Sequence, residues 1–150
     1  MSRRAYSRLF YHFAWATKNR REIIVPEFED RLYAHFKRKC EEYGFVYIAG
    51  GGMPEHVHLL LRAEPESAPS AIAGKIKGAS SHFVKHGLLQ GDEFEWQRGY
   101  GVHSVGDDGI KRVIAYIRNQ KQHHGAEDIV EDWEKTETFE ESVDDIFASP

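Results

Sequence analysis

Residues 53–61, which read MPEHVHLLL, place two histidines two positions apart in a stretch that resembles a β-strand. Side chains two apart on a strand lie on one face of a sheet, so His56 and His58 would lie side by side while Val57 points the other way. The leucines at 59–61 would anchor this strand in a core. Two neighbouring imidazoles can coordinate one metal ion, but such pairs also occur in ordinary half-buried strands. The pair alone leaves a metal site and a structural role both open.

A second short stretch, Tyr116–Gln120, lies in a run with helical periodicity. Side chains four apart on a helix share a face, so the phenol of Tyr116 and the amide of Gln120 would project together. An unperturbed tyrosine has a pKa of about 10 and is a poor nucleophile at neutral pH. A nearby cation that neutralises charge on a phosphate makes attack feasible, and the Gln120 carbonyl oxygen could complete its ligand shell. Considered alone, tyrosine and glutamine at this spacing are more often packing and surface residues than site residues.

The order of predicted elements is β-α-β-β-α-β-α, which favours an α+β fold. Strands are expected over 7–17, 45–49, 55–62 and 95–105, and helices over 26–43, 70–86, 110–123 and, as a short closing element, near 139–147. The first six elements match the ferredoxin-like (RRM-like) arrangement, in which helices cover one face of a four-stranded antiparallel sheet. The tyrosine-bearing helix would follow, and the histidine strand would be central. The run Gly50–Gly52 is expected to end the second strand and lead into a hairpin.

Composition restricts the class of protein. A chain of 150 residues with 41% hydrophobic residues fits one packed domain. The single cysteine, Cys40, excludes an intrachain disulfide and a cysteine-rich zinc finger. No apolar stretch approaches the ~18 residues needed to cross a bilayer, and no signal-peptide core follows Arg3 and Arg4. We therefore expect a cytoplasmic protein with no membrane contact.

Charge divides the chain into two parts. Residues 1–124 contain 19 Lys or Arg and 14 Asp or Glu, a net charge of +5, whereas residues 125–150 contain one Lys and ten Asp or Glu, a net charge of −9. We expect a domain over 1–125 and an acidic tail over 126–150. A basic body can attract phosphates by releasing counterions. The tail is either a solvated surface or a shield for the basic face.

Single-stranded nucleic acid is bound by a positive groove with aromatic stacking platforms. The candidates for the groove are Lys18, Arg20, Arg21, Lys75, Lys77 and Arg98. Lys75 and Lys77 are two apart on a helix and so do not share a face. The stacking candidates are Trp15, Trp96 and Tyr100, for which core packing is the alternative.

In these residues the chain resembles the small single-tyrosine transposases of the HUH superfamily (His, bulky hydrophobe, His). It is more closely similar to the insertion-sequence 200-like group and its REP-associated relatives. The resemblance covers about residues 8–124 and rests on motifs in a fixed order. They are WATKNR (15–20), MPEHVHLLL (53–61), KIKGASS (75–81), WQRGYG (96–101) and YIRNQKQHH (116–124). Their order and spacing are more specific than any one motif.

The resemblance implies a homodimer that cleaves and rejoins single-stranded DNA near hairpins through a 5′-phosphotyrosine intermediate. It implies Mg²⁺ or Mn²⁺ as the cofactor. Carried over by position, Tyr116 would be the nucleophile and His56, His58 and Gln120 the metal ligands. The tyrosine helix can serve a partner's histidines in this family, so the sites could be composite. The acidic tail has no counterpart in the family pattern.

Three other interpretations remain open from the sequence. A non-catalytic module could read single strands with its sheet, as RNA-recognition motifs do. A domesticated transposase would keep the site without moving an element. A metal-dependent hydrolase could use His56, His58 and a carboxylate such as Glu55, although strand alternation would turn Glu55 to the opposite face.

Overall fold

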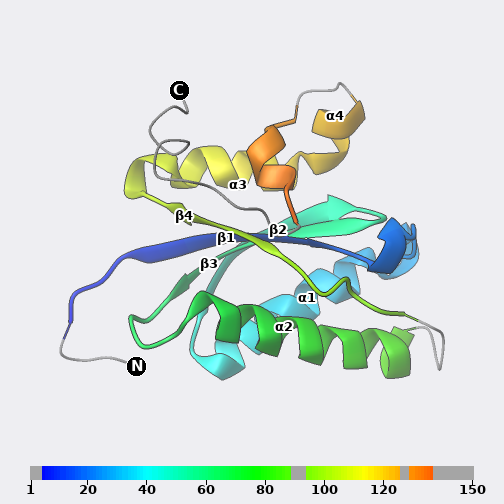
Figure 1. The fold of residues 1–150 in the computed structure, drawn as a ribbon, viewed down its shortest axis with the longest axis horizontal. Coiled ribbons are helices and arrows are strands. Elements are labelled where there is room, and N and C mark those ends of the chain that lie inside the picture. Colours follow the sequence, from blue (N-terminus) through cyan, green and yellow to red (C-terminus); the bar gives the residue numbers. More distant parts are fainter. Residues whose placement is uncertain (1–4, 89–93, 126–128, 137–150) are drawn as a thin grey trace.

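A computed structural model describes residues 5–88, 94–125 and 129–136. Its centre is a four-stranded antiparallel sheet in the order β2-β3-β1-β4 (Figure 1). The strands are β1 (Leu9–Ala16), β2 (Val46–Met53), β3 (His56–Ala63) and β4 (Gly101–Val105). The helices are α1 (Pro26–Tyr43), α2 (Pro69–Phe83), α3 (Ile110–Arg118) and α4 (Gln120–Gly125). This is the predicted ferredoxin-like α+β fold, with β3 in the interior of the sheet.

Helices α1 and α2 cover one face of the sheet, and α3 and α4 lie over the other (Figure 1). The face toward α1 and α2 carries the larger core, which includes Phe13, Trp15, Val57, Leu59 and Leu61. These residues alternate along β1 and β3, as side chains on one face of a strand must. The core therefore fixes which residues of β3 face the other way.

A second, smaller core lies under α3. Phe10 of β1, Ala49 of β2 and Leu60 of β3 contact Val113 and Ile117 of α3. His56 and His58 alternate with the larger core's residues on β3, so they share this second face with Leu60. The sheet and α3 thus enclose the histidine pair.

Several predicted boundaries were wrong. The glycines do not break β2, which continues through them to Met53. An added Cβ at Gly51 would lie 2.4 Å from the carbonyl oxygen of Ile117, so the missing side chain lets α3 approach the strand closely. The fourth strand is restricted to Gly101–Val105, and within the described residues 94–100 the predicted strand is reduced to an isolated bridge between Thr17 and Trp96.

The tyrosine helix also differs from the prediction. It is not continuous: Asn119 leaves helical geometry, with φ −106° and ψ 25°, and separates α3 from α4. A 3-10 turn, η4 (Glu131–Glu134), follows after the gap. The predicted closing helix near 139–147 lies outside the described residues. Among the residues that are described, no helix has the length and apolar character needed to span a bilayer.

Candidate active site

The two histidines of β3 lie side by side beneath α3. His56 and His58 are 1% and 0% exposed, and their ring centroids are 5.1 Å apart. β3 is paired on both edges, with β1 on one side and β2 on the other. The strand therefore holds both imidazoles on a rigid support, which favours a functional pair of ligands.

The two residues predicted on the tyrosine helix reach the same place. The ring of Tyr116 lies 5.8 Å from the ring of His58, centroid to centroid. Oε1 of Gln120 lies 3.1 Å from Nε2 of His56, and the Gln120 side-chain amide donates to the Tyr116 carbonyl at 3.4 Å. Both side chains are buried, at 4% and 1% exposure. The break at Asn119 therefore does not separate them, and one chain brings the four predicted site residues together.

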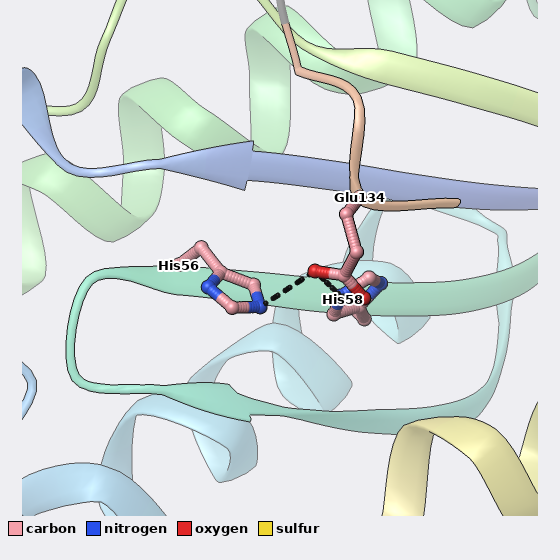
Figure 2. Close-up of side chains that lie close together, drawn as sticks. All are labelled: His56, His58 and Glu134. Atoms are coloured by element: carbon pink, nitrogen blue, oxygen red, sulfur yellow. Dashed lines mark hydrogen bonds and ion pairs between the residues drawn. The ribbon is translucent and has the colours of Figure 1, made fainter. Parts of the chain in front are cut away.

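A fifth residue, Glu134, extends its carboxylate toward both histidines (Figure 2). Its Oε1 is 3.1 Å from Nε2 of His56, and its Oε2 is 3.2 Å from Nε2 of His58. The hydroxyl of Tyr116 donates a hydrogen bond to the same carboxylate. The sequence did not single out Glu134, because it is one of ten acidic residues in the tail and belongs to none of the recognised motifs.

The carboxylate and the histidines shift each other's protonation. Burial lowers the pKa of His56, but hydrogen bonds to Glu134 and Glu55 outweigh burial and raise that pKa to about 9. Burial raises the pKa of Glu134, but hydrogen bonds from His56 and His58 outweigh it and hold that pKa well below its usual range. At neutral pH the site therefore contains a His56 imidazolium paired with a Glu134 carboxylate.

The phenol of Tyr116 is protonated in this arrangement. Burial and then the hydrogen bond to Glu134 raise its pKa to about 12. The hydroxyl oxygen also accepts a hydrogen bond from the backbone N–H of Val130 at 3.0 Å. Glu134 and Val130 thus bring the acidic part of the chain onto this hydroxyl.

Each histidine has a further partner on its other ring nitrogen. Oε1 of Glu55 lies 2.9 Å from Nδ1 of His56, and Nε2 of His12 lies 2.8 Å from Nδ1 of His58. The expectation that Glu55 faces away was wrong, because Glu55 lies in the turn before β3 and does not follow strand alternation. Burial lowers the pKa of His12 to about 3, so its ring is neutral.

The described residues offer one group suited to a metal ion. Ligand atoms of His56, His58 and Glu134 all lie within 4.8 Å of one another. Two imidazole nitrogens and a carboxylate oxygen suit divalent transition metals, and the Gln120 oxygen adds a second hard donor beside His56. The donor set therefore fits a divalent cation.

Specific contacts hold the segment that carries Glu134. An added Cβ at Gly101 would lie 2.0 Å from the carbonyl oxygen of Lys135, so only glycine permits this approach to β4. The Gln97 amide donates to the Thr136 carbonyl at 3.1 Å. The ring of Trp133 packs against Tyr116 and His12 at centroid distances of 4.9 and 5.5 Å. These contacts therefore hold residues 133–136 in a defined position against the body of the protein.

The chain matches the family described as "Transposase IS200 like" over residues 5–120. It is 31% identical over 117 residues to the ISDra2 transposase TnpA of Deinococcus radiodurans, covering 75% of this chain and 84% of the relative. The chain belongs to the IS200-like transposase family. A provisionally named REP-associated tyrosine transposase of Haemophilus influenzae is 24% identical, with 82% of this chain and 76% of the relative covered. The predicted family is thus confirmed.

Two solved structures share the fold. A crystal structure of a provisionally named transposase from Deinococcus radiodurans has a TM-score of 0.64 at 29% identity, covering 80% of this chain and 96% of that one. A REP-associated tyrosine transposase, solved bound to a REP hairpin, has a TM-score of 0.61 at 21% identity, covering 83% and 74%. The α+β architecture of this transposase is therefore that of known members.

The predicted DNA-contacting residues of the transposase fall into two groups. Lys18, Arg20, Arg21 and Arg98 are exposed and lie at one end of the sheet. The backbone places them there, because Thr17 donates to the Glu55 carbonyl and Gln97 to the Ala16 carbonyl, each at 2.9 Å. Ala16 pairs with His56 in the register of β1 and β3. This group, which we name the basic turn cluster, therefore lies beside the His56 end of the site.

Lys75 and Lys77 lie elsewhere, on α2 across the sheet from the histidines. The ammonium of Lys77 donates to the carbonyls of Gln97, Arg98 and Gly99 at 2.7, 3.1 and 3.0 Å. These three bonds use all its hydrogens, so Lys77 holds a loop instead of presenting a free charge. The exposed Lys75 lies over the ring of Tyr43.

The three aromatic residues considered for base stacking differ in how deeply they are buried. Trp15 is fully buried and Trp96 is 8% exposed, and their rings pack edge to face at 5.9 Å. The Trp96 indole donates to Ser80 at 2.9 Å. Both tryptophans are core residues, which confirms the alternative of core packing for them. Tyr100 is half-buried and packs on Phe13.

Proposed function

We propose that this transposase cleaves and rejoins single-stranded DNA near hairpins, with Tyr116 as the nucleophile of a 5′-phosphotyrosine intermediate. The observation that carries the proposal is that a phenol and two buried imidazoles from distant parts of the chain converge, with ring centroids of Tyr116 and His58 5.8 Å apart. Family membership supplies the reaction class. The geometry supports the assignment of roles.

In the proposed step, the Tyr116 oxygen attacks a backbone phosphorus and forms an O–P bond. The phenol releases its proton to solvent as the bond from phosphorus to the 3′ oxygen breaks, and the leaving oxygen takes up a proton from solvent as a free 3′-hydroxyl. The phosphotyrosine keeps the energy of the broken phosphodiester, so a 3′-hydroxyl can reverse the step without ATP. Before attack, Tyr116 has to give up the hydrogen bond that it donates to Glu134.

We propose a divalent cation, Mg²⁺ or Mn²⁺, as the cofactor. His56 and His58 would hold it through Nε2, with an oxygen from Gln120, as predicted, or from Glu134. The bound cation would neutralise charge on the non-bridging phosphate oxygens. The protein's own contribution is to hold the imidazoles on a paired strand and to exclude water from a site whose residues are nearly all buried.

The DNA partner is inferred from a relative and from charge. The structural neighbour bound to a REP hairpin is a tyrosine transposase of similar fold. In this chain the basic turn cluster places Arg20, Arg21 and Arg98 beside the His56 end of the site, together with Lys18, which forms an ion pair with Glu95 at 3.1 Å. We propose that this cluster binds the phosphates of the hairpin or its flanking strand, with an affinity that falls steeply with salt.

We propose that Tyr116 acts on the metal site of its own chain. Its contacts with His58 and Glu134 are made within one chain, which supports this arrangement over a composite dimer site. Mixing Tyr116→Phe with His56→Ala protein distinguishes the two: only a composite site restores activity in mixed dimers. A homodimer remains a prediction and is compatible with both arrangements.

The proposal is tested with labelled hairpin oligonucleotides and Mg²⁺ on a denaturing gel. The wild-type protein should form a covalent adduct, Tyr116→Phe should bind hairpin but form no adduct, and His56→Ala or His58→Ala should lose metal-dependent cleavage. Normal cutting by Tyr116→Phe would exclude the proposal and leave hydrolysis by the metal site. Hairpin binding with no adduct under any divalent cation would indicate a binding module or a domesticated transposase.

A further inference from the structure

His12 lies directly behind one of the two proposed metal ligands. Its Nε2 is 2.8 Å from Nδ1 of His58, and the two rings are 1% and 0% exposed. In the register of β1 and β3, His58 is opposite Ala14, so His12 is its diagonal neighbour on the same face of the sheet. The two strands thus set the spacing of the rings, and no loop contributes to it.

The position of the hydrogen in this contact follows from the role of His58. A neutral imidazole carries one N–H, on either Nδ1 or Nε2. Nε2 of His58 faces Glu134 and the other ligand atoms, so binding of a cation requires a lone pair there. When a cation is bound, the hydrogen of His58 must then be on Nδ1, where it donates to Nε2 of His12. Without a cation, Nε2 of His58 donates to Glu134 instead. His12 in turn carries its own hydrogen on Nδ1, a buried atom with no hydrogen-bond partner in the described part of the chain.

We propose that His12 is a positioning residue: it fixes the tautomer and ring orientation of His58 so that Nε2 is presented to the divalent cation. This inference rests on the metal site of the proposed function. Partners of this kind on a metal-ligating histidine usually change metal affinity by 10–100-fold when removed. The role differs from that of a ligand, because His12 is separated from the cation by the ring of His58.

The choice of a neutral partner has a physical reason. His56 already has a carboxylate partner in Glu55, and Glu134 places a second carboxylate in the site. A third carboxylate behind His58 would add negative charge where a DNA phosphate has to bind. A neutral imidazole supplies the hydrogen-bond acceptor without that charge, and Trp133 packs on its ring.

The test compares three variants of the full-length protein. His12→Phe keeps a ring against Trp133 but accepts no hydrogen bond. His12→Gln places an amide oxygen about where Nε2 lies. His103→Phe is the matched control, because His103 pairs with His12 in the sheet but lies on β4, on the side away from β3.

Mn²⁺ affinity is measured by calorimetry without DNA, and histidine tautomers by long-range ¹H–¹⁵N NMR with Zn²⁺. We expect His12→Phe to bind Mn²⁺ 10–100-fold more weakly and to lose the single Nδ1–H tautomer of His58. His12→Gln and His103→Phe should stay within about threefold of wild type, since a hydrogen-bond acceptor for His58 is retained in both.

Two results would overturn this inference and leave the proposed function standing. One is unchanged Mn²⁺ affinity in His12→Phe, and the other is a wild-type His58 that carries its hydrogen on Nε2 when Zn²⁺ is bound. The second measurement needs no variant, so it decides the matter even if His12→Phe does not fold. A wild-type protein that binds no divalent cation would overturn both this inference and the metal site of the proposed function.

Discussion

Glu134 accepts a hydrogen bond from the hydroxyl of Tyr116, so a carboxylate from the acidic part of the chain lies against the proposed nucleophile. The same carboxylate contacts Nε2 of both His56 and His58. It therefore occupies the space between nucleophile and metal ligands, where a scissile phosphate would have to enter. In the proposed reaction, a phosphate would therefore reach Tyr116 only after the hydroxyl leaves this carboxylate.

Replacing Glu134 with Gln should lower the pKa of Tyr116 from about 12 toward its ordinary value of 10. The carboxylate disfavours the phenolate, and its removal leaves burial as the remaining cause of the raised pKa. The titration can be followed by ¹³C NMR of labelled tyrosine ring carbons, with Tyr116→Phe identifying the signal. Glu131→Gln is the matched control, since it removes a charge from an exposed position of the same 3-10 turn. An unchanged pKa in Glu134→Gln would show that the carboxylate does not act on the phenol in solution.

The pair formed by His56 and Glu134 should make folding stability depend on pH. The raised pKa of His56 stabilises the fold below about pH 6.5, and this contribution is lost as pH rises through about 9. The lowered pKa of Glu134 stabilises the fold above about pH 4.5, and this contribution is lost as pH falls. Both contributions are present together between about pH 4.5 and 6.5.

Urea unfolding in EDTA should therefore show the largest difference between wild type and Glu134→Gln in that window, of about 2 kcal/mol. The difference should shrink as pH approaches 9, because His56 becomes neutral in both proteins. A difference that stayed constant from pH 5 to 9 would mean that the ion pair contributes no net stability.

The sequence was sufficient to predict the sheet and four of the site residues because their placement follows from local periodicity. His56 and His58 share a face by the two-residue repeat of a strand, and Tyr116 and Gln120 by the four-residue repeat of a helix. The fold then brings these faces together, as the order of elements indicated. Their roles in catalysis stay predictions.

Glu134 and His12 could not be predicted in the same way, because each reaches the site through contacts distant in sequence. His12 becomes a neighbour of His58 only through the register of β1 with β3. The position of Glu134 depends on the contacts that its segment makes with Gly101 and Gln97. The break between α3 and α4 at Asn119 was missed as well, because the helical periodicity of the sequence continues across it.

Gly101→Ala should displace the segment that carries Glu134. The new Cβ would meet the Lys135 carbonyl oxygen at 2.0 Å, and because that atom belongs to the backbone the segment has to move. Hydrogen exchange should then be faster in residues 129–136, and Trp133 fluorescence should shift as the indole leaves Tyr116. Gly106→Ala, where an added Cβ meets nothing within 4 Å, is the control. Equal protection of residues 129–136 from hydrogen exchange in both variants would show that the close approach at Gly101 does not hold the segment.

Gly51→Ala should impair cleavage by moving the tyrosine helix. Its Cβ would lie 2.4 Å from the Ile117 carbonyl oxygen and 3.3 Å from the Ile117 side chain, so α3 has to shift away from β2. Ile117 is the residue after Tyr116, so the shift also moves the phenol relative to His58. Overpacking of this kind costs about 1–3 kcal/mol of stability.

The matched control is Gly78→Ala, at an exposed position of α2 where an added Cβ meets nothing within 4 Å. It should raise stability by up to about 1 kcal/mol, because alanine is the better helix former, and leave adduct formation unchanged. Adduct yield is compared at a temperature where circular dichroism shows both variants folded, which separates displacement of the phenol from simple unfolding. If folded Gly51→Ala formed adduct at the wild-type rate, close packing of α3 on β2 would not be what aligns Tyr116 with the histidines.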